Sequence, residues 1–488
     1  MKKIAFSILI LAAGCASVQA QLALTRHAET KNASADLLRD GLYAGWHKGL
    51  DVWVGEGRRG RKQVVVSDHN LETLGRMEMP ESTVNHRLLT AASSGGGLTA
   101  VLCDEPDNQH TVVYGALVDL DSMRPADLTA PLTVVDSFSY GRKDRCMVWG
   151  ATSPNRQYTA VVVIVEYTER NQYSARARVM DARLQTVWTR DYAMGSTEQL
   201  CITDAGRIVT LGHEYAGDET HIVYNVLDER RADSYDVVVT CDPLRELRLT
   251  GVVGSHAMAV GTFMPTGSDP RDLLTGGVVG MSFDIDSAVM TGFTMRPFQN
   301  EDLNILYNKK TKKMQRDQVV DLASVLDATS TQWGAVVAVG RNYMATRVEN
   351  NGVSTKGYFR QGVHVVGVDT LGRVRFARNL RRNDVQKNSD DLLNLSLLSR
   401  YGVVYVVKSE HKGYPATYDI AKEAPEFTVG SKGNLAVYTI GADGEVGKTV
   451  AETKTPHTLL RSIPHPDDTF ELITTDGSRC RIAELKIR

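Results

Sequence analysis

The sequence predicts an all-β protein that folds as one repeat domain over 21–488, after a short leader. Three observations support this prediction. Short runs of Val, Ile, Thr and Tyr recur along the chain, Gly, Asp, Asn and Pro bound these runs, and one strand–turn–strand unit returns several times. The longest apolar runs after the leader, such as 160–165, have the length of a strand and are too short to span a membrane.

The repeated unit is a strand that ends in Asp or a turn residue, followed by a tight turn and another strand. Seven copies contain Asp68, Asp119, Asp181, Asp228, Asp284, Asp369 and Asp443, and 481–484 is similar to a truncated eighth copy. The shortest intervals, 47 and 51 residues, are close to the roughly 40–50 residues of a four-stranded propeller blade. We therefore predict a β-propeller with seven or eight four-stranded blades.

The strand pattern also predicts how one blade is built and how the ring closes. The four strands of the third unit are expected at 146–153, 158–167, 174–181 and 184–192. The last blade is expected to combine strands at 457–464, 469–475 and 479–487 with a fourth strand from 21–27, which leaves no open sheet edge at the junction. Two segments, 298–328 and 382–398, break the rhythm with apolar spacings that permit short helices, and we interpret them as insertions.

Residues 1–20 have the three parts of an export signal peptide in order. Lys2 and Lys3 form the basic start, 4–16 is apolar, and Val-Gln-Ala at 18–20 places small or compact residues at the cleavage positions, so cleavage after Ala20 is expected. A lipoprotein is the alternative, because Leu-Ala-Ala-Gly-Cys at 11–15 is similar to a lipobox in which Cys15 receives the lipid. Both interpretations place the protein outside the cytoplasm.

Charge and cysteine content give no sign of a nucleic-acid partner or a zinc site. Removal of the leader lowers the 56 basic residues to 54, against 58 acidic residues, for a net charge of −4. The remaining cysteines are Cys103, Cys146, Cys201, Cys241 and Cys480, which are widely spaced and odd in number. Single buried thiols are the favoured interpretation, although export permits disulfides.

Ser-Pro-Asn at 153–155, before a run of Val and Ile, is typical of propeller blades. With this rhythm, most of 45–488 resembles the exported β-propeller-like proteins of Gram-negative bacteria. The resemblance rests on strand rhythm, since the sequence lacks the Trp-Asp, kelch and sialidase signatures. It implies a location in the periplasm, at the cell surface or outside the cell.

Loops between the second and third strands of the blades are expected on one face of the ring. They are short in the early units and lengthen to 264–274, 341–361 and 410–432 in the later ones. Binding surfaces are usually built from loops on a rigid frame, so this sector is the predicted site for a polar ligand or a protein. Its candidate residues are Asn342, Tyr343, Arg347, Tyr358, Arg360, His411, Tyr414 and Tyr418. The alternative is that long loops are tolerated decoration, because added length costs little closure entropy.

Groups of metal-ligand residues occur in the sequence, but their spacing favours turns. The best group comprises His213, Glu214, Asp218, Glu219 and His221. It lacks the His-Glu-x-x-His spacing and is expected on a strand–loop–strand segment, which favours a solvated polar loop. The same interpretation applies to Asp119 with Asp121, Asp284 with Asp286, and His465 with Asp467 and Asp468. No metal or other cofactor is predicted.

No catalytic motif has the required spacing. The segment 352–357 is near Gly-x-Ser-x-Gly but is one residue too long, and no glycine-rich phosphate loop joins a strand to a helix. The leading hypothesis is an exported scaffold that binds a polar ligand or a protein. The alternatives are a propeller enzyme, a hydrolase or lyase acting on carbohydrate or peptide, and a structural lipoprotein of a surface complex anchored through Cys15. Convergence of three or more Asp, Glu, His or Arg side chains at the channel mouth would favour the enzyme.

Overall fold

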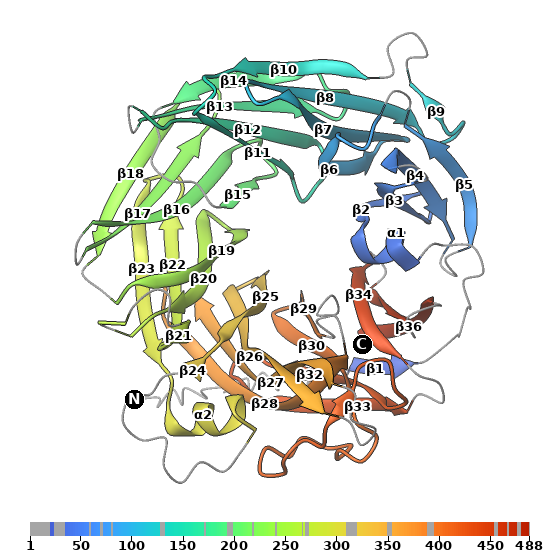
Figure 1. Ribbon diagram of the computed structural model, residues 1–488, viewed down its shortest axis with the longest axis vertical. Helices are drawn as coiled ribbons and strands as arrows, with labels where there is room; N and C mark the ends of the chain where they lie inside the picture. The colour runs from blue at the N-terminus through green and yellow to red at the C-terminus, as the bar shows by residue number, and fades with distance from the viewer. Residues whose placement is uncertain are drawn as a thin grey trace, which may run out of the picture.

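The chain forms a closed ring of β-sheets in the computed structural model (Figure 1). The structure describes residues 20–23, 35–57, 60–68, 72–79, 82–126, 132–169, 172–192, 199–216, 219–239, 242–265, 267–268, 273–308, 320–348, 354–387, 395–452, 457–465, 468–475 and 480–487. Within these ranges, eight sheets of four or five strands follow one another around the ring. The predicted β-propeller is confirmed, with eight blades. Residues 1–19 of the predicted leader, 1–20, and Cys241 lie outside the described residues.

Each blade has four antiparallel strands, the first of which lies innermost in the ring (Figure 1). Blade 6 carries an additional strand, which pairs parallel with its outer strand. Blade 1 contains β2 (Leu42–His47), β3 (Leu50–Glu56), β4 (Lys62–Ser67) and β5 (Thr73–Glu78), and blade 2 contains β6 (Arg87–Ser94), β7 (Gly97–Asp107), β8 (His110–Asp119), β9 (Arg124–Pro125) and β10 (Thr133–Ser139). Blade 3 contains β11 (Arg145–Thr152), β12 (Tyr158–Tyr167), β13 (Gln172–Asp181) and β14 (Thr186–Tyr192). Blade 4 contains β15 (Gln199–Ile202), β16 (Ile208–Ala216), β17 (Glu219–Leu227) and β18 (Ala232–Val239).

The second half of the ring follows the same plan with additions. Blade 5 contains β19 (Leu244–Val253), β20 (His256–Phe263), β22 (Gly277–Asp284) and β23 (Val289–Pro297), and blade 6 contains β25 (Ala323–Thr331), β26 (Gly334–Val348), β27 (Ser354–Asp369), β28 (Val374–Lys387) and β31 (Phe427–Thr428). Blade 7 contains β29 (Leu395–Arg400), β30 (Val403–Glu410), β32 (Asn434–Ile440) and β33 (Val446–Glu452). Blade 8 contains β34 (Thr458–Pro464), β35 (Thr469–Thr475), β36 (Cys480–Ile487) and β1 (Ala20–Ala23). The additions are the pair β21 (Leu274–Thr275) and β24 (Val320–Asp321), with the helices α1 (Ala35–Asp40) and α2 (Asn300–Leu306). Neither helix is long and apolar enough to cross a membrane.

The seven repeated aspartates all lie where the third strand of a blade ends and the turn to the fourth begins. The reason is local hydrogen bonding: Asp181 Oδ1 accepts the backbone N–H groups of Arg183 and Gln185, and Asp369 Oδ1 accepts those of Leu371 and Arg373. Comparable bonds are made by Asp68, Asp119, Asp228, Asp284 and Asp443. The predicted turn role of Asp119 and Asp284 is therefore confirmed.

The two ends of the chain meet in blade 8. Strand β1 pairs antiparallel with β36, and its register places Ala20 opposite Ile487 and Ala23 opposite Glu484. The predicted closing strand therefore exists at Gln21–Ala23, and 24–27 lie outside the described residues. We call the junction between blades 8 and 1 the seam.

The predicted insertions are only partly helical. Helix α2 falls within 298–328, as expected, but Val325 and Leu326 belong to β25, the inner strand of blade 6. In 382–398 the described residues continue β28 or begin β29. Short apolar runs do not distinguish strand from helix, and pairing of β25 with β26 decides in favour of the strand.

Neighbouring blades are joined by hydrogen bonds on one face of the ring. This turn face carries the turns between first and second strands, such as 48–49, 203–207 and 401–402, together with the aspartate turns. Ser282 Oγ donates to Thr370 O at 2.6 Å between blades 5 and 6, and Trp333 Nε1 donates to Gly402 O at 2.8 Å between blades 6 and 7. We call the opposite face, with the connections between second and third strands, the loop face.

A close approach of two backbones adds to the contact between blades 5 and 6. A Cβ atom on Gly292 would lie 2.0 Å from the carbonyl oxygen of Leu371. Gly292→Ala is expected to lower the free energy of unfolding by about 1–3 kcal/mol, because backbone atoms must shift. Urea unfolding measures this, with Gly97→Ala as the control, since a Cβ there meets Val118 O at an ordinary 3.4 Å. Equal stability of the two variants would contradict the prediction.

Candidate functional site

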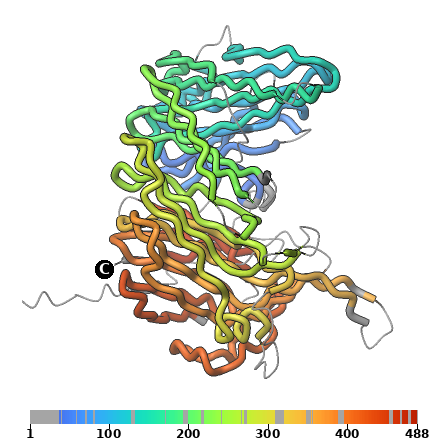
Figure 2. The backbone as a smooth tube through the Cα atoms, turned by 90° about the vertical axis from the view of Figure 1, so that its left-hand side faces the viewer, coloured from blue at the N-terminus to red at the C-terminus, as the bar shows by residue number. Residues whose placement is uncertain are grey.

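The most prominent feature of the loop face is a pair of strand extensions that we call the arm, residues 341–348 and 354–361. Strands β26 and β27 have 15 and 16 residues and remain paired to Val348 opposite Ser354. Figure 2 shows this hairpin, in orange, extending beyond the ring. The sequence predicts a loop here, and that expectation is wrong because the two segments continue the sheet of blade 6.

Aromatic stacking and an ion pair hold the base of the arm. The rings of Tyr343 and Phe359 stack with centroids 5.0 Å apart. The guanidinium of Arg341 lies over the rings of Tyr343 and Tyr307, at 4.3 and 4.6 Å, and pairs with Asp321 at 2.9 Å. This pairing, against the effect of burial, holds the pKa of Asp321 below its ordinary value. Through Arg341, the arm is therefore fixed to Tyr307 at the end of α2 and to Asp321 of β24.

The opposite side of the arm presents apolar surface. Met344 is 56% exposed and lies across the strand pair from the half-buried Tyr358. Asn342 lies two residues closer to the ring on the same face of β26. Its side-chain amide donates to Ser324 Oγ at 2.9 Å. Tyr358, one of the predicted site residues, and Met344, which the sequence analysis did not select, therefore have surface available to a partner.

Arg360, another predicted site residue, is buried at the base of the arm. Its guanidinium donates to Gln386 Oε1 at 3.2 Å, next to a buried ion pair between Arg382 and Asp384 at 2.6 Å. Arg360 therefore supports the sheet of the arm. Arg347 lies on β26, and its side chain is outside the described residues.

The loop 411–433, between β30 and β32, contacts β28 of blade 6 and β33 of blade 7. Its strand β31 pairs with Asp384 and Val385 of β28, and Tyr418 donates from its hydroxyl to Asn379 O at 2.9 Å. Tyr414 is buried, and His411 Nδ1 accepts the Gly413 N–H within the loop. The structure thus divides the predicted residues between the arm and this loop, where the two tyrosines pack inward.

A buried charged cluster, missed at the sequence level, lies beneath this loop. Glu410 pairs with Lys408 at 3.1 Å and Lys448 at 2.5 Å and accepts the Tyr438 hydroxyl at 2.9 Å. Burial alone would raise the pKa of Glu410, but the two lysine charges outweigh it and hold the pKa below its ordinary value. The only sequence signal is the presence of charges inside an otherwise apolar strand.

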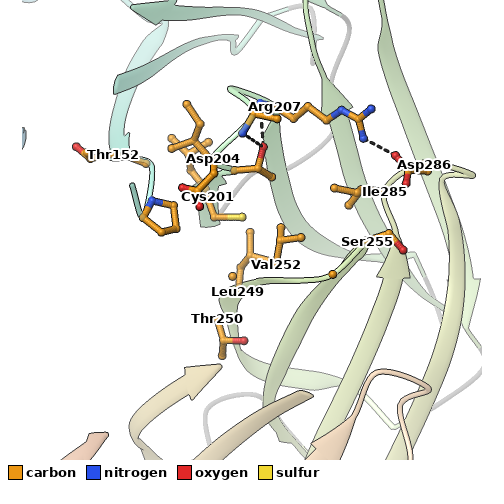
Figure 3. A pocket seen from close by; sticks show the side chains of 18 residues that line it. Thr152, Cys201, Asp204, Arg207, Leu249, Thr250, Val252, Ser255, Ile285 and Asp286 are labelled. Carbon is orange, nitrogen blue, oxygen red and sulfur yellow. Dashed lines mark hydrogen bonds and ion pairs between the residues drawn. The ribbon is translucent and has the colours of Figure 1, made fainter. Parts of the chain in front are cut away.

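The turn face contains a cavity of about 780 Å³ between blades 3, 4 and 5 (Figure 3). Its lining includes Cys201, Asp204, Arg207, Thr250, Ser255 and Asp286. Burial raises the pKa of the Cys201 thiol to about 12, so the thiol stays protonated and is a poor nucleophile. Cys103 and Cys146 are also free thiols, and Cys480 is buried.

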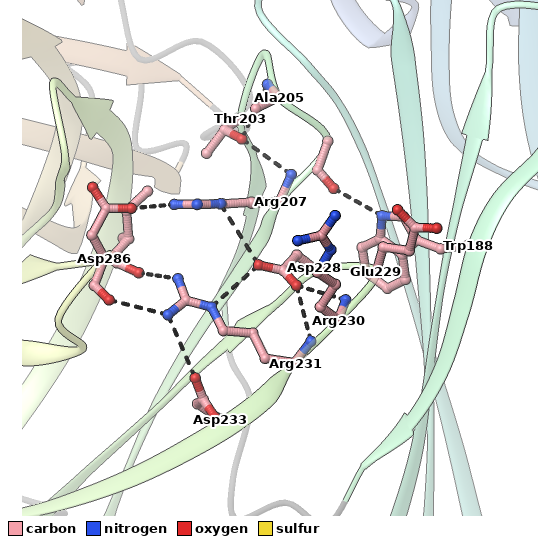
Figure 4. Close-up of polar contacts among 12 residues, drawn as sticks. Trp188, Thr203, Ala205, Arg207, Asp228, Glu229, Arg230, Arg231, Asp233 and Asp286 are labelled. Carbon is pink, nitrogen blue, oxygen red and sulfur yellow. Dashed lines mark hydrogen bonds and ion pairs between the residues drawn. The ribbon is translucent and has the colours of Figure 1, made fainter.

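Beside this cavity, a network of charges ties blade 4 to blade 5 (Figure 4). Arg207 pairs with Asp286, and Arg231 donates to Ile285 O at 2.6 Å and to Asp228 at 3.2 Å. Burial would raise the pKa of Asp228, but hydrogen bonds from the Arg230 and Arg231 backbone, with the Arg231 charge, lower it. Because these charges neutralise one another, the network joins blades and does not have the character of a catalytic centre.

Of the predicted polar loop, His213 and Glu214 lie on β16, and Glu219 and His221 lie on β17, whereas Asp218 is outside the described residues. His221 lies opposite Glu214 across the strand pair, whereas His213 lies opposite Ile222. The two imidazoles therefore project from opposite faces of the sheet and cannot share a metal ion. His221 Nδ1 instead pairs with Asp236 at 2.9 Å, which raises the pKa of His221.

The topology of the described residues defines the chain as an eight-bladed β-propeller, and solved structures similar to it include β-propellers. No protein-family model matches the chain, and no curated protein sequence matches it. The WD40 domain of SCAP from fission yeast is 9% identical, with a TM-score of 0.37, and the match covers 96% of this chain and 98% of that one. For the β-propeller domain of the Trilobed protease from Pyrococcus furiosus, the identity is 9%, the TM-score 0.29 and the coverage 71% and 94%. The polysaccharide lyase Uly1 is 10% identical, with a TM-score of 0.34, and the match covers 96% of this chain and 97% of that one.

Proposed function

We propose that this protein is an exported β-propeller that binds a protein partner through the apolar side of its arm, at Met344 and Tyr358. The observation that carries the proposal is the projection of Met344, 56% exposed, beside Tyr358 on a hairpin that extends beyond the ring (Figure 2). Exposed apolar side chains next to aromatic ones are typical of protein interfaces. Methionine in particular adapts its shape to different partners.

The rigidity of the arm supports this proposal. Continuous pairing to Val348, the Tyr343–Phe359 stack and the clamp on Arg341 hold the hairpin in one conformation. A surface that is already ordered loses little conformational entropy when it binds. The arm therefore suits a recognition element better than a tolerated insertion.

Photo-crosslinking in cells tests this function. With a photoreactive residue in place of Met344, we expect one crosslinked adduct of defined mass, and we expect none from the same residue at Leu74, which is equally exposed on the outer strand of blade 1. Met344→Asp is expected to weaken capture of that partner at least tenfold. The proposal fails if the folded, exported protein gives no adduct from Met344, or the same adduct from both positions.

The export part of the proposal rests on the leader, 1–20. Cleavage after Ala20 would leave Gln21–Ala23 to pair with β36 and close the ring. Intact-mass measurement of the mature protein is expected to show an N-terminus at Gln21 or its pyroglutamate. A lipid-modified Cys15 would instead support the tethered alternative.

A further inference from the structure

Three potential metal ligands from the two ends of the chain meet at the seam. Asp51 comes from the second strand of blade 1, whereas His465 and Glu471 come from the first turn and second strand of blade 8. One ligand atom from each lies within 4.8 Å of the other two. This cluster is separate from the arm and does not depend on the proposed function.

The two carboxylates are buried together. Asp51 is 2% exposed and Glu471 is 4% exposed. Asp51 Oδ1 accepts the Tyr43 hydroxyl at 3.0 Å, but Glu471 Oε2 has no hydrogen-bond partner among the described residues. A buried carboxylate oxygen that accepts no hydrogen bond is costly, and the 3.5 Å contact with His465 Nε2 does not supply one, so a further positive group would stabilise the site.

The electrostatics of the cluster indicate the same missing charge. The charged groups that act most strongly on Asp51 are Glu471, His465 and Asp68, of which two are acidic. Both carboxylates are buried, so little solvent screens the repulsion between Asp51 and Glu471. A bound cation would relieve this repulsion.

The geometry fits one metal ion. His465 Nε2 and Glu471 Oε2 are 3.5 Å apart. Two ligands on a tetrahedral ion with bonds of about 2.1 Å are separated by about 3.4 Å. The turn that carries His465 is held in place, because the His465 N–H donates to Thr469 O and Arg400 donates to His465 O at 2.8 Å.

The ligand set also indicates the kind of metal. One imidazole with two carboxylates suits Zn²⁺ or Mn²⁺, whereas Ca²⁺ and Mg²⁺ prefer oxygen ligands alone. A catalytic carboxylate pair is a poorer interpretation, since burial of Asp51 and Glu471 closes the site to a carbohydrate or peptide. Only the His465 side chain, 18% exposed, leaves a route for an ion.

We propose that Asp51, His465 and Glu471 bind one divalent transition-metal ion, Zn²⁺ or Mn²⁺, which joins the first and last blades of the ring. The metal bonds would cross the seam next to the β1–β36 pairing and so link parts of the chain that are far apart in sequence. Because the ion binds only the closed ring, it stabilises the folded protein.

Calorimetric titration of the chelator-treated full chain with ZnCl₂ and MnCl₂ tests this proposal. We expect one site per chain for at least one of the two metals and weaker binding of Ca²⁺ and Mg²⁺. At a hundredfold excess over the dissociation constant, the unfolding temperature is expected to rise by about 3 °C. Asp51→Asn and Glu471→Gln are each expected to lose the site and this temperature shift.

Asp121→Asn is the matched control, because Asp121 pairs with His47 on the exposed turn face and is expected to leave metal binding unchanged. The Asp51 and Glu471 variants remove buried charge, so their metal-free unfolding temperatures are expected to equal or exceed that of the wild type. The absorption spectrum of bound Co²⁺, compared between the wild type and His465→Gln, provides a readout of metal binding that does not depend on stability. Absence of one-site binding in the wild type, or unchanged binding in all three ligand variants, would overturn the proposal.

Discussion

Replacement of Glu410 by glutamine is expected to lower the free energy of unfolding by about 3–5 kcal/mol. The Glu410 carboxylate is the acidic partner of Lys408 and Lys448, and both lysines are buried beneath the loop 411–433. An amide cannot balance their charge, so two ammonium groups would remain in a poorly solvated site. The rings of Tyr414 and Tyr438 offer them only weaker cation–π contacts.

Urea unfolding near neutral pH measures this effect, with Glu423→Gln as the control. Glu423 is exposed on the same loop, and its replacement is expected to change stability by no more than about 0.5 kcal/mol. The lowered pKa of Glu410 means that its contribution is present above pH 4.5 and is lost as the pH falls through the folded value. The difference in the free energy of unfolding between wild type and Glu410→Gln should therefore become smaller at acidic pH. A loss equal to that of the control would contradict the prediction.

Trp53→Ala is also expected to lower the free energy of unfolding by about 3–5 kcal/mol, because it empties the apolar centre of the seam. Trp53 is 0% exposed on β3 and packs in one cluster with Leu37 and Leu38 of α1 and with Ile463 and Ile473 of blade 8. The Arg461 guanidinium covers its ring at 5.5 Å. The substitution therefore weakens contacts of both ends of the chain with blade 1.

Trp46→Ala is the matched control within blade 1, since Trp46 is 39% exposed and its loss is expected to cost about 1 kcal/mol or less. Trp53→Phe should retain much of the stability because an aromatic ring still fills most of the space. Thermal unfolding of the three variants provides the comparison. Equal losses for Trp53→Ala and Trp46→Ala would show that the seam is not held by this cluster.

The predictions that succeeded rest on local interactions. An aspartate that accepts backbone N–H groups two to four residues further on forms its turn without help from the rest of the chain. This is why Asp181 and the six other aspartates marked the blades correctly. Strand-length runs rich in β-branched residues and bounded by turn residues also located β12 at 158–167 and β35 at 469–475.

The predictions that failed depend on which segments meet. Residues 341–361 have the composition of a loop, yet 341–348 and 354–361 continue as paired strands because β26 and β27 lie side by side. Ala323–Thr331 has apolar spacing that also permits a helix, and pairing with β26 makes it a strand. In the candidate site, Arg360 and Tyr414 look available in the sequence, but packing of β28 and the loop 411–433 buries both.

The sequence by itself determined the propeller class, the blade number to within one, the aspartate turns and the pairing of the two chain ends. Only the tertiary structure decided that His465 lies beside Asp51 and Glu471, whereas the sequence associated it with its neighbours Asp467 and Asp468. The physical reason is that strand and turn patterns come from hydrogen bonds between residues close in the chain. Contacts across the seam depend on the closure of the whole ring, which no local pattern encodes.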